Sequence, residues 1–316
     1  MKKNTFYTDR RNIVLLATLC CILWGSAYPA IKAGYSLFNI NSNDIESKLI
    51  FAGYRFALAG ILVLLLEIVK KKSIFDFSIK QFGEITLLGS MQTALQYIFF
   101  YVGLSYTTGV RGSIINGTGT FVSIILAHFI YKNDKLNFNK ISGCIIGFLG
   151  VVIVNLNGQS VAGNSFTFKG EGFMMIAAII FAASAIYGKK ITQNKDASIV
   201  TGYQLFIGGV ILIILGYILG GSLTGFTFNS TVLLVYMALL SSVSFAVWTQ
   251  LLKYNKVGVI SVFNFLVPVF GALLSAIFLG ENIFDIKILI ALILVCLGIF
   301  LVYKEKKDKN ILSNEI

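Results

Sequence analysis

A single arginine lies deep within an apolar stretch of the chain. Arg55 follows Gly53 and Tyr54 and precedes an apolar run that continues to Leu66. A charged side chain at membrane depth costs roughly 3 kcal/mol or more on insertion scales, so it usually faces a cavity or a polar partner. One interpretation is that the guanidinium binds a carboxylate through two parallel hydrogen bonds. The alternative is a structural arginine that extends toward the headgroups or bonds to backbone carbonyls.

Neutral polar side chains recur in other apolar stretches, at spacings that place them on shared helix faces. Gln92 and Gln96 are four residues apart, and Phe100 continues the same stripe. Asn116 and Asn264 occupy similar places in two later stretches. Amides within membrane helices most often join helices, whereas a continuous polar stripe favours a cavity lining. Further candidates for this lining are Tyr187, Gln204, Ser244 and Trp248.

Aromatic side chains near the middle of the first apolar stretch complete the candidate set. Trp24 and Tyr28 are four residues apart and share a helix face, and Pro29 follows directly. They lie away from the interfacial positions where membrane aromatics usually gather. A proline within a membrane helix is tolerated where neighbouring groups satisfy the backbone. The pattern is typical of either a pocket wall or core packing, and we take both aromatics as candidate binding residues.

The sequence lacks the residue patterns of an enzyme or a metal site. It has no metal-ligand cluster, phosphate-binding loop or paired carboxylates. The apolar stretches also lack a convincing Asp or Glu, which argues against a proton relay and against a bare organic cation as substrate. Lys32, near the end of the first stretch, is interpreted as a lysine that extends to the headgroups.

Composition indicates a membrane protein. Hydrophobic residues make up 56% of the 316 residues and charged residues only 13%, with a mean hydropathy of +0.82, whereas a soluble domain carries about 25% charged residues. About 20 apolar residues are needed to cross a hydrocarbon core of roughly 30 Å. Ten stretches meet or approach this length, which predicts an all-α integral membrane protein. The predicted spans are 13–33, 49–69, 83–104, 110–131, 140–156, 170–188, 199–220, 231–252, 257–279 and 286–303.

The formal net charge of +12 could suggest nucleic acid as a partner, but the distribution of the charge argues otherwise. If the N-terminus is inside the cell, most of the 26 lysines and arginines fall in inner segments, and the outer segments hold Lys48, Arg111, Lys169 and Lys287. This asymmetry is the positive-inside pattern of membrane proteins. It predicts a multi-pass protein of the plasma membrane with both termini in the cytoplasm, and no nucleic-acid partner.

The second half of the chain resembles the first. Gly202-Tyr203-Gln204 opens an apolar run as Gly53-Tyr54-Arg55 does, and segment 268–283 has the layout of segment 120–136. Five predicted spans per half is an odd number, so the second copy must be inverted relative to the first. Inverted repeats in transporters place the substrate site near the bilayer midplane. We therefore expect ten transmembrane helices as two inverted five-helix repeats, residues 1–157 and 158–316.

Short motifs connect the chain to a known family. Trp24-Gly25-Ser26 followed by Lys32 resembles the first-helix signature of the EamA type in the drug/metabolite transporter superfamily. Val267-Pro268-Val269 leading to Gly280-Glu281 is similar to its ninth-helix signature, although the first half lacks the matching proline. The resemblance implies a central cavity framed by helices 1, 3, 4, 6, 8 and 9, alternating access and no common cofactor. Members move amino acids and related metabolites, often outward, and others move nucleotide sugars, phosphosugars or drugs.

We therefore expect a secondary transporter, and not an enzyme, that works in the lipid bilayer on a small-molecule substrate. An amino acid or related zwitterion is the favoured substrate class, with export by alternating access. A passive facilitator or channel of the same fold and a lipid-handling membrane protein are the alternatives. Gly143 and Gly147 can pack within the chain or between two chains, which leaves a homodimer open.

Overall fold

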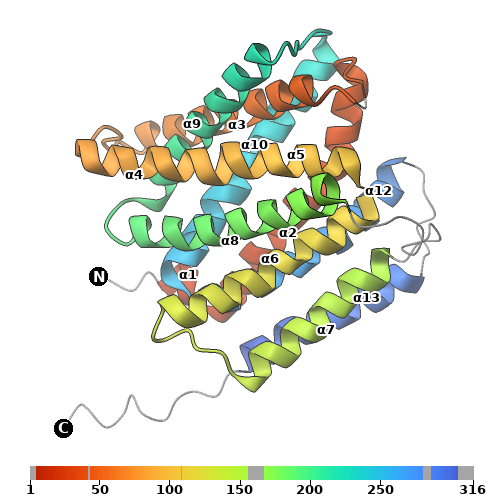
Figure 1. Ribbon diagram of the computed structural model, residues 1–316. Helices are drawn as coiled ribbons and strands as arrows, with labels where there is room; N and C mark the ends of the chain where they lie inside the picture. The colour runs from red at the N-terminus through yellow and green to blue at the C-terminus, as the bar shows by residue number, and fades with distance from the viewer. Residues whose placement is uncertain (1–4, 42, 108, 156–166, 280–285, 305–316) are drawn as a thin grey trace.

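The computed structural model describes residues 5–41, 43–107, 109–155, 167–279 and 286–304, and these fold mainly into helices (Figure 1). In chain order the elements are α1 (Thr5–Thr8), α2 (Arg10–Leu37), α3 (Ile45–Val69), α4 (Ile79–Gly89), the π-helical turn η1 (Ser90–Leu95), α5 (Gln96–Tyr106), α6 (Gly109–Ile130), α7 (Phe138–Asn155), the π-helical turn η2 (Phe168–Gly172), α8 (Phe173–Thr192), α9 (Ala197–Ile218), α10 (Phe228–Tyr254), α11 (Val257–Ser261), the 3-10 turn η3 (Val262–Phe265), α12 (Leu266–Leu279) and α13 (Ile286–Tyr303). These helices lie where the sequence predicts membrane spans, with ends that differ by a few residues.

Seven helical stretches of the described chain are long and apolar enough to cross a membrane. They are Arg10–Leu37, Ile45–Val69, Ile79–Tyr106, Phe168–Thr192, Ala197–Ile218, Phe228–Tyr254 and Val257–Ser275. Shorter apolar helices cover Ile115–Ile130, Phe138–Ile153 and Leu289–Tyr303. The predicted class, an all-helical membrane protein, is therefore confirmed.

Polar caps fix where several of the helices begin. The side chains of Asp9, Asp44 and Asp196 accept hydrogen bonds from backbone N–H groups in the first turns of α2, α3 and α9. Ser78 and Thr227 form capping boxes at the starts of α4 and α10. Each cap contributes about 1 kcal/mol to helix stability, because it satisfies N–H groups that have no acceptor inside the helix. The polar loops thus set the ends of the apolar helices.

Glycines let α3 and α9 pack with their backbones in contact. A Cβ atom placed on Gly60 would lie 2.6 Å from the carbonyl oxygen of Gly202. A Cβ atom placed on Gly209 would lie 2.8 Å from the carbonyl oxygen of Gly53. Small residues permit so close an approach of membrane helices. The two helices therefore form one packed pair along one side of the bundle (Figure 1).

A second packed pair, α7 with α13, lies at the other side of the bundle (Figure 1). A Cβ atom on Gly143 would lie 2.6 Å from the carbonyl oxygen of Gly298, and one on Gly298 would lie 2.5 Å from the carbonyl oxygen of Gly143. A Cβ atom on Gly147 would lie 2.7 Å from the ring of Phe265. These glycines are used in packing within the chain, so they give no support to a homodimer.

The remaining long helices lie between these two pairs (Figure 1). Among them, α2 crosses α12 at Gly25, where an added Cβ atom would lie 2.7 Å from the Cβ atom of Phe270. The guanidinium carbon of Arg10 lies 5.2 Å from the centre of the Tyr303 ring. The start of α2 and the end of α13 therefore meet at the same end of the bundle.

Pro268 is accommodated without a break in α12. It is the third residue of that helix, and the N–H groups of a first turn have no acceptor inside the helix, so a missing one costs little there. The tighter 3-10 turn η3, which contains Asn264, lies just before it within the helical stretch Val257–Ser275.

Replacing Gly60 by valine should destabilise the protein, because a Cβ atom there would lie 2.4 Å from the backbone nitrogen of Phe206 and the backbone would have to move. Overpacking of this kind costs about 1–3 kcal/mol. The thermal unfolding midpoint of the purified protein in detergent should therefore fall by several degrees. The control is Gly83→Ala on α4, where a Cβ atom meets nothing within 4 Å and alanine favours the helix by about 1 kcal/mol. Equal midpoints for the two variants would contradict the backbone contact.

Candidate functional site

Seven of the predicted site residues gather around one cavity inside the bundle. Its volume is about 320 Å³, at the lower end of the roughly 300–1,000 Å³ that small-molecule sites occupy. Helices α2, α3, α5, α6, α8, α10 and α12, together with η3, supply its lining. The predicted residues in the lining are Trp24, Tyr28, Arg55, Gln96, Phe100, Asn116 and Asn264.

Arg55 is oriented by a fixed hydrogen bond at the cavity wall. The residue is 2% exposed, and its Nε donates to the hydroxyl oxygen of Ser241 at 2.7 Å. That hydroxyl donates its single proton to the carbonyl oxygen of Met237 at 2.9 Å, so toward Arg55 it can only accept. The guanidinium carbon also lies 4.9 Å from the centre of the Phe56 ring, a cation–π contact. The other guanidinium N–H groups bond to no other described residue, which leaves them for a ligand.

Aromatic rings form much of the cavity wall. The Trp24 ring lies edge-on to the rings of Trp248 and Phe245, with centroid separations of 4.9 and 5.4 Å. Tyr97 and Phe100 form a similar pair at 6.0 Å. Edge-on pairs contribute about 0.5–1.5 kcal/mol beyond the burial of their area. The rings therefore hold one another in place and present a fixed apolar surface to the cavity.

Some polar atoms of the cavity lining are buried without a hydrogen-bond partner among the described residues. They include the indole Nε1 of Trp24 and the amide Oε1 of Gln96. Leaving one such group unpaired costs about 1–3 kcal/mol, and native structures contain few of them. Asn116, Asn264 and Thr120 add further polar groups to the lining. The cavity thus combines a buried cation, neutral polar groups and aromatic walls, which suits a ligand with a charged head and an apolar body.

Five predicted site residues lie outside this lining: Gln92, Tyr187, Gln204, Ser244 and Trp248. The Gln204 amide donates to the Thr93 hydroxyl at 3.3 Å, and the Ser244 hydroxyl donates to the Ser241 carbonyl at 3.4 Å. Tyr187 packs in a separate cluster with Leu88, and Trp248 packs against Trp24. Gln204 and Trp248 thus join helices, which is the usual role of such side chains inside membrane bundles, whereas the Ser244 hydroxyl bonds within α10.

A π-helical turn explains why Gln92 and Gln96 do not share a face. The four-residue spacing brings two side chains together in an α-helix of 3.6 residues per turn. Residues 90–95, however, form η1, in which hydrogen bonds run from residue i to i+5 and the chain turns more slowly. Gln96 therefore lines the cavity, whereas Gln92 lies outside it.

Lining residues that the sequence did not single out for the site include the polar or charged side chains of Lys32, Tyr35, Tyr97 and Tyr101. On α2 the signal is present, because Lys32 and Tyr35 follow Trp24 by eight and eleven residues and so fall on the same helix face. In the structure Lys32 is an exposed residue at the mouth of the cavity. On α5, the two tyrosines flank the predicted stripe of Gln96 and Phe100.

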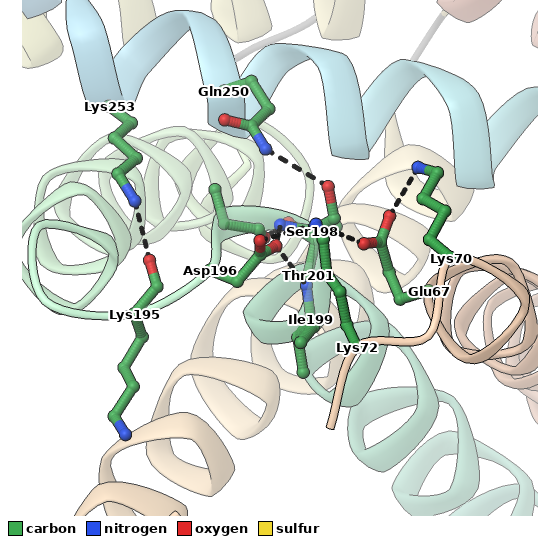
Figure 2. A network of polar contacts seen from close by, with 11 residues as sticks. Glu67, Lys70, Lys72, Lys195, Asp196, Ser198, Ile199, Thr201, Gln250 and Lys253 are labelled. Atoms are coloured by element: carbon green, nitrogen blue, oxygen red, sulfur yellow. Dashed lines mark hydrogen bonds and ion pairs between the residues drawn. The ribbon is translucent and has the colours of Figure 1, made fainter. Parts of the chain in front are cut away.

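Charged side chains join helix ends at the end of the bundle away from Lys32. Figure 2 shows these contacts. The Lys72 ammonium forms ion pairs with Glu67 at 2.5 Å and with Asp196 at 2.7 Å. Lys70 adds a contact to Glu67 at 2.8 Å. Because Glu67 lies in the last turn of α3 and Asp196 caps α9, this network ties the two helices together.

Polar and aromatic contacts close the same end of the bundle around α10. The Lys253 ammonium donates to the carbonyl oxygen of Lys195 at 2.7 Å (Figure 2). The Asn255 amide donates to the carbonyl oxygen of Tyr7 at 2.8 Å, and the Tyr7 ring stacks on Tyr254 with a centroid separation of 5.7 Å. We call this end, where these contacts join the helices, the closed end; the exposed lining residue Lys32 lies near the other end of α2, and we call that end the mouth of the cavity.

An all-helical membrane bundle that encloses a ligand-sized cavity has the architecture of a membrane transporter. The chain belongs to the EamA-like transporter family, whose model matches residues 11–156 and 168–304. The family expected from the motifs is therefore confirmed, and the protein is a multi-pass membrane transporter.

Two of the similar proteins are named transporters, and this chain covers most of their length. An uncharacterized transporter of Archaeoglobus fulgidus is 26% identical over 271 residues, 85% of this chain and 89% of that protein. The uncharacterized transporter YvbV of Bacillus subtilis is 26% identical over 310 residues, 95% of this chain and 94% of that protein. A WAT1-related chloroplastic protein of Arabidopsis thaliana is 23% identical over 273 residues, 84% of this chain and 63% of that protein. A crystal structure with 15% identity superposes with a TM-score of 0.76 over 93% of this chain and 97% of that one, which shows the same fold.

A cysteine at position 264 should react with a water-soluble maleimide, and a cysteine at position 204 should not. Asn264 lines the cavity, whereas Gln204 is 1% exposed and bonded to a neighbouring helix. The two variants, Asn264→Cys and Gln204→Cys, are compared in a Cys296→Ser background, because Cys296 is the exposed native cysteine of the described chain. Mass spectrometry measures labelling, and unfolded protein controls for intrinsic reactivity. Equal labelling rates in the folded protein would contradict the assignment of Asn264 to the cavity lining and of Gln204 to a helix contact.

The pKa of Asp196 determines how the network at the closed end responds to acid. Burial raises this pKa. The hydrogen bond and charge of Lys72 and the N–H groups of Ile199 and Ser198 lower it by more, so the pKa of Asp196 lies below its ordinary value of 3.8. For Lys72, burial lowers the pKa, but hydrogen bonds to Asp196 and Glu67 raise it above 10.5 overall. The stability from this pair is therefore present through the neutral range and is lost as the pH falls through the lowered carboxylate pKa.

Asp196→Asn should lower the thermal midpoint near neutral pH by the equivalent of about 0.2–1 kcal/mol, the range for partly exposed ion pairs. Asparagine still caps α9 but carries no charge, so the variant isolates the ion pair. Asp196→Ala removes the cap as well and should cost about 0.5–2 kcal/mol more. The midpoints are measured from about pH 3 to pH 8, and the deficit of the asparagine variant should shrink toward the acid end. A deficit that stays constant over this range would argue against an ionised pair.

Proposed function

We propose that this EamA-family protein is a secondary transporter that moves a small polar metabolite bearing a carboxylate by alternating access. The observation that carries the proposal is the buried guanidinium of Arg55, which lines the cavity and pairs with no carboxylate of the described chain. A buried charge without a counter-ion is costly, and a ligand carboxylate would supply that counter-ion through two parallel hydrogen bonds. Amino acids and related zwitterions carry such a group, and Gln96 and Asn116 offer hydrogen bonds to the rest of the molecule.

The same proposal includes ten crossings arranged as two inverted repeats, residues 1–157 and 158–316. The seven long apolar helices and the three shorter ones are consistent with this number. When Gly53 is aligned with Gly202, Gly60 is aligned with Gly209. The contact of Gly60 with Gly202 then corresponds to the contact of Gly209 with Gly53, and both contacts occur. A pseudo-two-fold axis between α3 and α9 accounts for this exchange. The boundary between 157 and 158 lies outside the described residues.

We place the protein in the plasma membrane with both termini in the cytoplasm. The contact of Arg10 with Tyr303 supports this placement, because an even number of crossings brings both ends to one side. The positive-inside pattern assigns that side, with Lys70 and Lys72, to the cytoplasm. The closed end then faces inward and the cavity mouth faces outward. Export, the direction that the family resemblance favours, requires a second state that loads from the cytoplasm.

Alternating access fits the closed end better than passive flow does. A facilitator or channel of the same fold needs a continuous path through both ends of the bundle. The stacking of Tyr7 on Tyr254 and the hydrogen bond from Asn255 occupy one of these ends. Saturable transport is therefore expected.

The test is uptake of radiolabelled carboxylate solutes, amino acids among them, into proteoliposomes that contain the purified protein. Arg55→Ala should lower kcat/KM about 10- to 100-fold, the loss expected for one hydrogen-bonded charge. Arg55→Lys should fall between this variant and the unmodified protein, because it keeps the charge but loses the planar fork. Lys80→Ala, which changes an exposed lysine at the start of α4, is the matched control. Saturable uptake that survives Arg55→Ala unchanged would refute the role of the arginine.

A further inference from the structure

The charged residues of the cavity lining are all basic. Among its described residues these are Arg55, in the wall, and Lys32, at the mouth. Three ion-paired acidic side chains, Glu67, Asp196 and Asp134, lie outside the lining and are matched with lysines: Glu67 and Asp196 with Lys72, and Asp134 with Lys140. Among the described residues, no carboxylate belongs to the lining that carries this positive charge.

This charge discriminates between a simple carboxylate and an α-amino acid. The ammonium group of an amino acid is attached one carbon away from its carboxylate, so a carboxylate on Arg55 brings the ammonium within a few ångströms of the guanidinium. Two like charges at that separation repel, and the burial of Arg55 limits how far water can screen the repulsion. The neutral groups nearby, Gln96, Asn116 and Asn264, can accept hydrogen bonds from an ammonium but carry no charge to offset the repulsion.

The rest of the lining fits an apolar body. Trp24, Phe100 and Phe245 present ring surfaces, and Ile31 and Val267 add aliphatic ones. These surfaces stabilise a ligand in proportion to the apolar area that leaves water, and ring–ring pairs add to this in specific edge-on geometries. A second charged or strongly polar group on the ligand body would lose its hydration against these walls.

We propose that the cavity selects organic anions with one carboxylate on an apolar, ring-sized body, and that it binds the corresponding zwitterions less tightly. The inference rests on the proposed role of the cavity as the substrate site, and it narrows the substrate class by charge. The carboxylate bonds to the guanidinium of Arg55, and the body lies between the rings of α2, α5 and α10. The positive charge of Lys32 at the mouth of the cavity attracts the anion.

The protein carries its own reporter of this site. The chain has two tryptophans, and their rings lie 4.9 Å apart at the cavity wall. Trp24 lines the cavity, and its indole nitrogen is unpaired. Ligand binding should therefore change the intrinsic fluorescence of the protein. This signal measures binding alone, without any need for transport.

The experiment is a fluorescence titration of the purified full-length protein with three probes that share a phenyl ring and differ in charge. The probes are 3-phenylpropanoate, phenylalanine and 2-phenylethylamine, at neutral pH. We expect 3-phenylpropanoate to bind at least tenfold more tightly than phenylalanine, and the amine to give no saturable change. Propanoate, which lacks the ring, should bind at least tenfold more weakly than 3-phenylpropanoate. Phenylalanine binding as tight as that of 3-phenylpropanoate, saturable binding of the amine, or no binding of any probe would overturn the inference.

Variants assign the selectivity to its source. Arg55→Gln should remove the preference for 3-phenylpropanoate over phenylalanine, whereas Arg55→Lys should keep most of it. Lys32→Gln should weaken both acids by a smaller factor, because this lysine is exposed. Each variant is first checked for a monodisperse elution profile and an unchanged helical circular dichroism spectrum. A preference that survives Arg55→Gln in a folded protein would also overturn the inference.

Uptake measurements with the same probes separate this inference from the proposed function. If 3-phenylpropanoate binds with the expected preference but no carboxylate solute is transported, the proposed function fails and the selectivity of the cavity stands. If phenylalanine is transported saturably and 3-phenylpropanoate neither binds nor competes, transport stands and the inference is wrong.

Discussion

Hydrocarbon offers no hydrogen bonds, and the placement of polar side chains in this protein follows from that constraint. Charges of the loops gather at helix ends, where Lys72 pairs with Glu67 and Asp196. Inside the bundle, amides and hydroxyls bond across helices, as Gln204 does with its neighbour on η1. Arg55 is tolerated because Ser241 accepts one of its N–H groups and because it borders a cavity and not lipid.

The two glycine-packed pairs and the helices between them have different tasks. In α3–α9 and α7–α13 the backbones touch, so a small displacement would open a gap or a clash, as in any close-packed interior. At the closed end, α10 and the residue that follows it are held by hydrogen bonds, from the Lys253 ammonium to the carbonyl of Lys195 and from the Asn255 amide to the carbonyl of Tyr7. Such polar contacts can be exchanged for water when the end opens. In the proposed alternating-access cycle we therefore expect the rearrangement to fall on the inner helices, while the outer pairs keep their packing.

Apolar length predicts the helices well, because the thickness of the hydrocarbon fixes it. Helical periodicity predicts Trp24 and Tyr28 on one face of α2, and the cost of a charge at membrane depth predicts Arg55 beside a cavity or a polar partner; all three line the cavity. Periodicity cannot distinguish a polar group that faces a cavity from one that faces a neighbouring helix, because both point inward, and Gln204 is of the second kind. The tyrosines of α5 are missed for the converse reason. Aromatic residues in membrane helices usually pack against lipid or other helices, so the sequence gives no cause to place Tyr97 in a lining.

The π-helical turn η1 divides one continuous rod, α4 with α5, into two parts (Figure 1). The first part ends at Gly89, where a Cβ atom would lie 2.7 Å from the carbonyl oxygen of Gln204, so it is docked on α9. The second part turns Gln96 and Phe100 toward the cavity. Each residue rotates an α-helix by about 100°. The extra residue of the π turn therefore rotates the side chains of α5, which line the cavity, relative to α4, which packs on α9. Gain or loss of one residue within Ser90–Leu95 would thus change which stripe of α5 meets the solute, while the docking of α4 stayed as it is.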